Sequence, residues 1–90
     1  MVQREAYVKS RYGIHARPAF AIHSEASKYQ DTEIRLIDPE DNSEVDAKSI
    51  LSILGMGMKC GEKLIVIAKG NQEEEAAESV AKTIREFEVT

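Results

Sequence analysis

A short stretch near the start of the chain places an imidazole and a guanidinium two residues apart, within the segment 13–19 of sequence GIHARPA. The spacing of apolar residues after it predicts a helix of about a dozen residues from Ala16. The first N–H groups of a helix have no partner within it and carry the positive end of its dipole, so an anion beside His15 would meet donors aimed at it. Arg17 adds a fork of donors that suits phosphate oxygens. These features together indicate an anion-binding site where the helix begins.

His15 is the candidate nucleophile of this site. Imidazole is partly neutral near pH 7, so one ring nitrogen keeps a lone pair that can attack phosphorus. Gly13 lets the chain turn without the strain of a Cβ atom, and Pro18 stiffens the first turn, where it is tolerated. We therefore predict reversible phosphorylation of His15. Taken from spacing alone, a polar surface histidine or a helix cap is the more common explanation of such a residue.

The elements that must position this site follow from the rest of the chain. Runs of β-favouring residues bounded by turn residues predict strands at about 3–9, 32–37, 44–46 and 64–68. The last of these runs is expected to be a central strand buried on both faces or nearly so. Two further helices are expected, one over the apolar run after Ser49, which would be its N-cap, and one near the end of the chain.

The last helix has the best defined pattern. Asn71 with Glu74 is close to a capping box, and three successive glutamates place negative charge at the positive end of the helix dipole. One apolar face is expected, made of Ala76, Ala77, Val80, Ile84 and Phe87. The predicted order is therefore βαββαβα, and too few residues remain for two helical layers. This favours an α+β fold with the helices on one face of a sheet.

Length, charge and cysteine content exclude several classes of protein. The 90 residues contain no linker-like stretch, so we expect a single domain over residues 1–90. Twelve basic against sixteen acidic residues give a net charge of −4, which does not support sequence-independent binding to nucleic acid or anionic lipid. The longest apolar run has five residues, too few to cross a bilayer, and no signal pattern stands at the start. A single cysteine excludes an internal disulfide and a Cys-based zinc site and fits a reducing compartment, so we expect a cytoplasmic protein. Phosphorylation of His15 would involve no metal or cofactor of the protein's own.

A second motif lies about thirty residues after the first, where Ala47-Lys48-Ser49-Ile50-Leu51 is followed by Leu54-Gly55. With both motifs at this separation, the whole chain resembles HPr, the family of histidine-containing phosphocarriers of the bacterial phosphotransferase system. The resemblance implies an open-faced β-sandwich, in which a four-stranded antiparallel sheet carries three helices on one face.

The resemblance also implies a relay. His15 would accept a phosphoryl group on Nδ1 from phosphorylated enzyme I, which draws it from phosphoenolpyruvate, and would pass it to the IIA domains of sugar permeases. Arg17 would stabilise the moving phosphoryl group. Such a carrier acts as a monomer and is a substrate protein as much as an enzyme. A hydrolytic enzyme is the weaker alternative, because no motif places a Ser, Cys or carboxylate partner beside His15.

Ser49 matches the position that an HPr kinase phosphorylates in many Gram-positive members of the family. A phosphate at a helix N-terminus is well tolerated, yet it would alter an adjacent apolar surface. The alternative function is therefore a regulatory binding module of the same fold, controlled at Ser49. A plain N-cap is the simpler interpretation of this serine. Relatives specialised for regulation can lack the histidine, so the presence of His15 favours the carrier.

The second helix is more apolar than its length requires, so part of it is expected at the surface. We expect a docking face for enzyme I and the permease domains, made of Ala16, Phe20, Ile50, Leu51 and Leu54. For Met56 and Met58, surface docking and core filling are equally open. His23 lies on the apolar stripe of the first helix and is expected to be a partly buried, hydrogen-bonded histidine rather than a second phosphorylation site.

Overall fold

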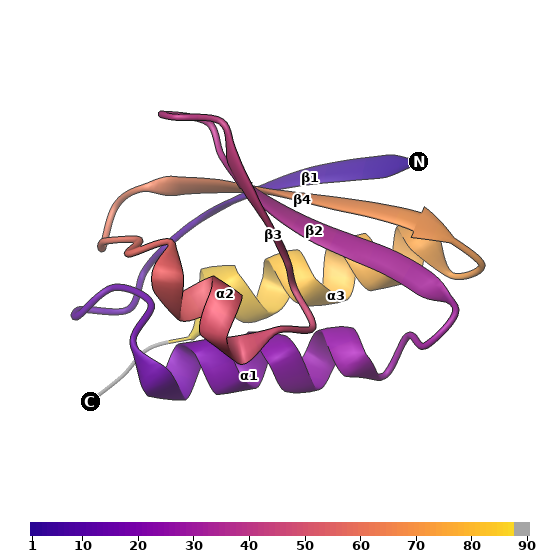
Figure 1. Cartoon of the computed structure of the whole chain (residues 1–90), viewed down its shortest axis with the longest axis horizontal. Coiled ribbons are helices and arrows are strands. Elements are labelled where there is room, and N and C mark those ends of the chain that lie inside the picture. Colours follow the sequence, from indigo (N-terminus) through magenta and orange to yellow (C-terminus); the bar gives the residue numbers. More distant parts are fainter. Residues whose placement is uncertain (88–90) are drawn as a thin grey trace.

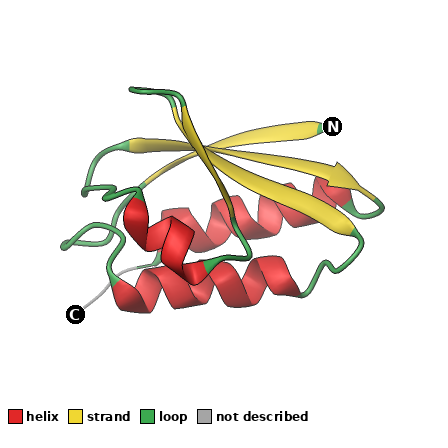
Figure 2. Cartoon of the chain, in the orientation of Figure 1, coloured by secondary structure: helices red, strands yellow, loops and turns green. Residues whose placement is uncertain are grey.

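The computed structural model of the chain describes residues 1–87. Its elements, in chain order, are β1 (Val2–Tyr7), α1 (Ala16–Ser27), β2 (Thr32–Asp38), β3 (Ser43–Asp46), α2 (Ile50–Gly55), β4 (Lys63–Gly70) and α3 (Glu73–Glu86). The strands pair antiparallel in the order β1-β4-β2-β3. The three helices lie together on one side of this sheet (Figures 1 and 2). The predicted order and the open-faced β-sandwich are confirmed.

Within residues 1–87, helices cover only one face of the sheet (Figure 1), and β4 shows this most clearly. Leu64, Val66 and Ala68 are fully buried against the helices, whereas Ile65 and Ile67 between them are half-buried. Successive side chains of a strand point to opposite faces of the sheet. The continuous apolar run of β4 is typical of a strand covered on both faces, but in the structure helices cover only one of them. The predicted central position of β4 is confirmed, whereas the predicted burial on both faces is wrong. On the open face, Ile65 pairs with Ile37 of β2, which partly covers both side chains.

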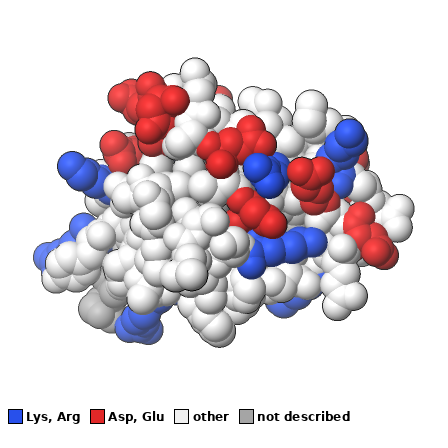
Figure 3. All heavy atoms as spheres, in the orientation of Figure 1, with Lys and Arg blue, Asp and Glu red and all other residues white. Residues whose placement is uncertain are grey.

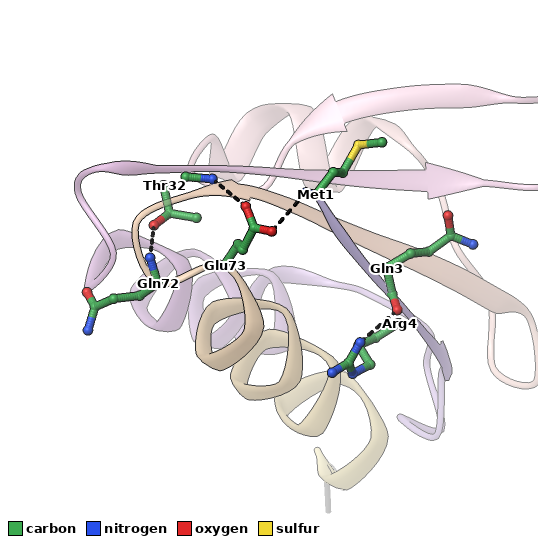
Figure 4. A network of polar contacts seen from close by, with 7 residues as sticks. Met1, Gln3, Arg4, Thr32, Gln72 and Glu73 are labelled. Atoms are coloured by element: carbon green, nitrogen blue, oxygen red, sulfur yellow. Dashed lines mark hydrogen bonds and ion pairs between the residues drawn. The ribbon is translucent and has the colours of Figure 1, made fainter.

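The start of α3 also differs from the sequence prediction. Gln72, not Asn71, is the N-cap residue, and its side chain makes no capping hydrogen bond. Glu73 replaces the predicted capping box, because its carboxylate accepts from Gly70 N–H at 3.0 Å and from the amino group of Met1 at 2.8 Å (Figure 4). The hydrogen bond from that amino group, with the one from Gly70, holds the pKa of Glu73 below its ordinary value. The predicted acidic first turn is confirmed.

The predicted apolar face of α3 is buried under the sheet, except that Phe87 follows the helix as a half-buried C-cap residue. Among residues 1–87, no helix is long and apolar enough to cross a membrane.

The two long helices are joined by a hydrogen bond from Ser79 of α3 to Glu25 of α1. This bond, helped by Lys28, lowers the pKa of Glu25 below its ordinary value, so folding favours the carboxylate. The resulting stabilisation is fully present above the ordinary pKa of a glutamate in the unfolded chain, and it is lost as the pH falls through the lower pKa of the folded state. We expect Ser79→Ala to cost about 1 to 2 kcal/mol at pH 7 and progressively less toward pH 3.

The measurement is urea unfolding of both proteins at several pH values. Ser24→Ala is the matched control, since Ser24 lies on α1 and makes no hydrogen bond through its side chain to a residue that the structure describes. A cost of Ser79→Ala that stays constant between pH 7 and pH 3 would contradict the assignment to the Glu25 carboxylate.

Candidate functional site

The backbone before α1 is held against the loop that follows α2. Gly13 N–H donates to the carbonyl of Ser10, which closes a turn, and Ile14 N–H donates to the carbonyl of Met58, both at 2.9 Å. Gly13 has a φ of +74°, and a Cβ atom there would clash with the Met58 carbonyl oxygen. Ser10 and Ile14 are buried on either side of this turn. The chain therefore enters α1 along one fixed path, as the glycine at this position predicted.

His15 is the N-cap residue of α1, with extended backbone angles and no side-chain capping hydrogen bond. Its carbonyl accepts from Ala19 N–H at 3.0 Å, and Pro18 has no N–H. The N–H groups of Ala16 and Arg17 remain, and no residue within 1–87 accepts a hydrogen bond from either. Two aligned donors at the positive end of a helix of 12 residues therefore stand beside the imidazole. They can hold an oxyanion that forms or arrives there.

The two ring nitrogens of His15 differ in their surroundings. Nε2 is buried and has no hydrogen-bond partner. Nδ1 also has no hydrogen-bond partner among the described residues, but unlike Nε2 it is not fully buried. The ring stands edge-on to Tyr12, with 6.1 Å between the centroids and 76° between the planes. Of the two nitrogens, Nδ1 is the one open to an incoming group.

Positive charge is available at this end of the molecule. Arg17 is exposed, and no residue among those described forms an ion pair or hydrogen bond with its guanidinium. The first turn of α1 contains no acidic residue that would oppose an anion. Figure 3 shows an uncharged area over α2 and the start of α1, with Lys and Arg atoms along its edge. The positive charge suits a phosphoryl group, and the uncharged area beside it suits the docking of a protein that delivers or removes that group.

Ser49 is the N-cap of α2, as predicted. Its Oγ accepts from Ser52 N–H at 3.3 Å and donates to Ser52 Oγ at 3.0 Å. The side chain is half-buried rather than enclosed. No charged residue occurs from Ser49 to Met58. A phosphate on Ser49 would therefore introduce charge into an uncharged part of the chain.

The predicted docking residues differ in exposure. Leu51 is 82% exposed and Phe20 is 59% exposed, and Ala16 is also at the surface. Ile50 and Leu54 are half-buried and pack against the core, so they contribute only part of their side chains. Met56 is half-buried as well, whereas Met58 is buried and fills the core. Helices α1 and α2 are in contact and lie side by side (Figure 1).

His23 is a partly buried histidine, as predicted, with Nδ1 2.8 Å from the carbonyl oxygen of Lys48. The ammonium group of Lys48 donates in turn to the carbonyls of Tyr29 and Thr32, at 2.7 and 2.8 Å. Lys48 thereby ties the segment before Ser49 to the end of α1 and the start of β2. Sequence reasoning missed this role, because the acceptors are backbone carbonyls 16 and 19 residues away, for which a sequence carries no signal.

No group of three or more His, Cys, Asp or Glu side chains within residues 1–87 is arranged to hold a metal ion.

Comparison with known proteins gives a consistent result. Residues 2–86 match the family described as PTS HPr component phosphorylation site. Phosphocarrier protein HPr of Mycoplasma pneumoniae is 34% identical over 89 residues, which is 99% of each chain. HPr-like protein Crh of Bacillus subtilis is 33% identical over 86 residues, or 96% of this chain and 98% of the relative. The crystal structure of HPr-C-His from Thermoanaerobacter tengcongensis superposes with a TM-score of 0.85 at 34% identity, covering 93% of this chain and 91% of that one.

Proposed function

The chain belongs to the HPr family of phosphocarriers of the phosphotransferase system, and from this membership we propose that His15 accepts a phosphoryl group from phosphorylated enzyme I and passes it to IIA domains of sugar permeases. The observation that carries the proposal is the position of His15 at the start of α1, beside the N–H groups of Ala16 and Arg17, for which no described residue is a partner. The relay draws its phosphoryl groups from phosphoenolpyruvate and operates in the cytoplasm, where the exposed thiol of Cys60 stays reduced.

Transfer requires little covalent chemistry from the protein. The lone pair of Nδ1 attacks phosphorus, a nitrogen–phosphorus bond forms, and the bond between phosphorus and the donor breaks. Charge on the phosphoryl oxygens is met by the two N–H groups at the helix start and by the Arg17 guanidinium. The reverse attack, by a nucleophile of the acceptor domain on the same phosphorus, returns His15 to its starting state.

Docking must bring donor and acceptor to the same nitrogen in turn. Ala16 and Phe20 on α1 and Leu51 on α2 are exposed, and Ile50 and Leu54 of α2 are half-buried. We propose that this face receives both enzyme I and the IIA domains, one at a time. A shared, mostly apolar surface suits brief contact with several partners.

The test of the relay is incubation with phosphoenolpyruvate and purified enzyme I, followed by intact mass, with a IIA domain added in a second step. The protein should gain one acid-labile phosphoryl group only when enzyme I is present, and should lose it when the IIA domain is added. Retention of the phosphoryl group after addition of a competent IIA domain would contradict the proposed carrier function.

The alternative function is a regulatory binding module controlled by phosphorylation of Ser49. The likeness to the Bacillus subtilis protein named Crh, whose solution structure is described as that of a catabolite repression HPr, favours this possibility. The half-buried Oγ of Ser49 holds two contacts with Ser52 at the start of α2. A phosphate there would replace these contacts and add charge next to the exposed Leu51.

A purified HPr kinase with ATP is expected to label the protein on Ser49. Ser49→Ala should remove the labelling, and Ser52→Ala, which alters the neighbouring serine of the same helix, should leave it in place. The phosphorylated protein should then accept a phosphoryl group from enzyme I more slowly, because the docking face carries new charge. Absence of labelling, with a known substrate labelled in parallel, would end the regulatory hypothesis.

A further inference from the structure

The imidazole of His15 is not held in place by hydrogen bonds to the described residues. Nε2 is buried without a partner, no described residue bonds to Nδ1, and the side chain does not cap α1. The other histidine of the chain is different, because Nδ1 of His23 is fixed by the carbonyl of Lys48 at 2.8 Å. The orientation of the His15 ring must therefore depend on non-polar contacts.

Tyr12 supplies such a contact. Its ring meets the imidazole in an edge arrangement, at 6.1 Å between centroids and 76° between planes, which is a favoured geometry for two aromatic rings. Tyr12 is 68% exposed, so burial in the core does not explain its position. The guanidinium carbon of Arg11 lies 6.0 Å from the centroid of the tyrosine ring, within the range of a cation–π contact.

The backbone determines where the Tyr12 ring stands. Tyr12 is a central residue of the turn that the Gly13 to Ser10 hydrogen bond closes. The buried side chains of Ser10 and Ile14 anchor the turn at both ends, and the bond from Ile14 to Met58 ties it to the loop after α2. The tyrosine is thus presented to His15 by a turn that has little freedom to move.

We propose that Tyr12 is a positioning residue for His15. Its ring keeps the imidazole rotated so that Nε2 faces into the protein and Nδ1 remains open to the phosphoryl donor. The proposal rests on the proposed phosphorylation of His15, but the orientation of the ring can be measured without any phosphoryl transfer.

The experiment compares Tyr12→Phe and Tyr12→Ser with the unaltered chain, all labelled with carbon-13 and nitrogen-15. The rotamer distribution of His15 is obtained from three-bond couplings, and single-turnover phosphorylation is measured at saturating enzyme I. In Tyr12→Ser, the rotamers of His15 should average and the single-turnover rate should fall about 2- to 10-fold. Tyr12→Phe should restore both, since it keeps the ring. The signals of His23 should be the same in all three proteins, which controls for the fold.

Unchanged His15 rotamers in Tyr12→Ser would overturn the proposal. A higher KM for enzyme I in Tyr12→Ser, with unchanged rotamers and an unchanged maximal rate, would also overturn it and make Tyr12 a docking residue. If the unaltered chain accepts no phosphoryl group at all, the proposed function fails, while the couplings still decide whether Tyr12 orients the ring.

Discussion

His15→Ala is expected to abolish phosphoryl uptake from phosphoenolpyruvate and enzyme I, with no mass increase above background. No other side chain at the start of α1 offers a nitrogen lone pair beside the N–H groups of Ala16 and Arg17. Loss of the nucleophile removes the bond-forming atom itself, so the effect is complete rather than partial. The His15 side chain makes no capping hydrogen bond, so the free energy of unfolding should change by less than about 0.5 kcal/mol.

The matched control is His23→Gln, which alters the only other histidine of the chain. His23 lies on the same helix, but its Nδ1 is occupied by the Lys48 carbonyl. This variant should gain one phosphoryl group as the unaltered chain does. Intact mass spectrometry checks both proteins, and full labelling of His15→Ala would show that another residue is the acceptor.

Gly13→Ala is expected to destabilise the protein by about 3 kcal/mol or more, the largest effect on stability that we predict for a single methyl group. Gly13 has a φ of +74°, which L residues rarely adopt. An added Cβ would also clash with the carbonyl oxygen of Met58 and would lie 3.1 Å from Cα of Lys59. Since that carbonyl accepts the hydrogen bond of Ile14, the loop in front of His15 must shift.

Gly57→Ala separates the two causes of this destabilisation, the positive φ and the clash of the added Cβ. Gly57 has a similar φ of +66°, but a Cβ there would have no neighbour within 4 Å. It should therefore cost only the backbone strain, about 1 to 2 kcal/mol. Urea unfolding followed by circular dichroism compares the two variants. Equal destabilisation would mean that the contact with Met58 does not constrain the loop. At temperatures where Gly13→Ala is folded, its phosphorylation should be slower than that of Gly57→Ala.

Sequence patterns predicted the parts of the fold that depend on local chemistry. Ser49 before an apolar run identified the N-cap of α2, and the glycine and proline around His15 identified the start of α1. The burial of His23 with a hydrogen bond also followed from its place on an apolar stripe. Each of these predictions needed only residues within one or two turns of helix.

The features that were predicted wrongly or missed depend on contacts between distant segments rather than on local chemistry. The apolar run of β4 does not reveal that helices cover only one face of the sheet. The cap of α3 depends on Glu73 reaching Gly70 and the distant Met1 amino group, rather than on Asn71. The tie between Lys48 and two backbone carbonyls likewise joins segments far apart in the sequence. Tertiary contacts decide these features, and a single sequence does not record them.

Whether Nδ1 of His15 carries the phosphoryl group can be read from a phosphorus–nitrogen correlation spectrum of the phosphorylated, nitrogen-15 labelled protein. We expect one acid-labile phosphorus signal, coupled to Nδ1 of His15, with both ring nitrogens of His23 unchanged. Phosphorus coupled to Nε2 of His15, to either nitrogen of His23 or to no histidine nitrogen would contradict this expectation.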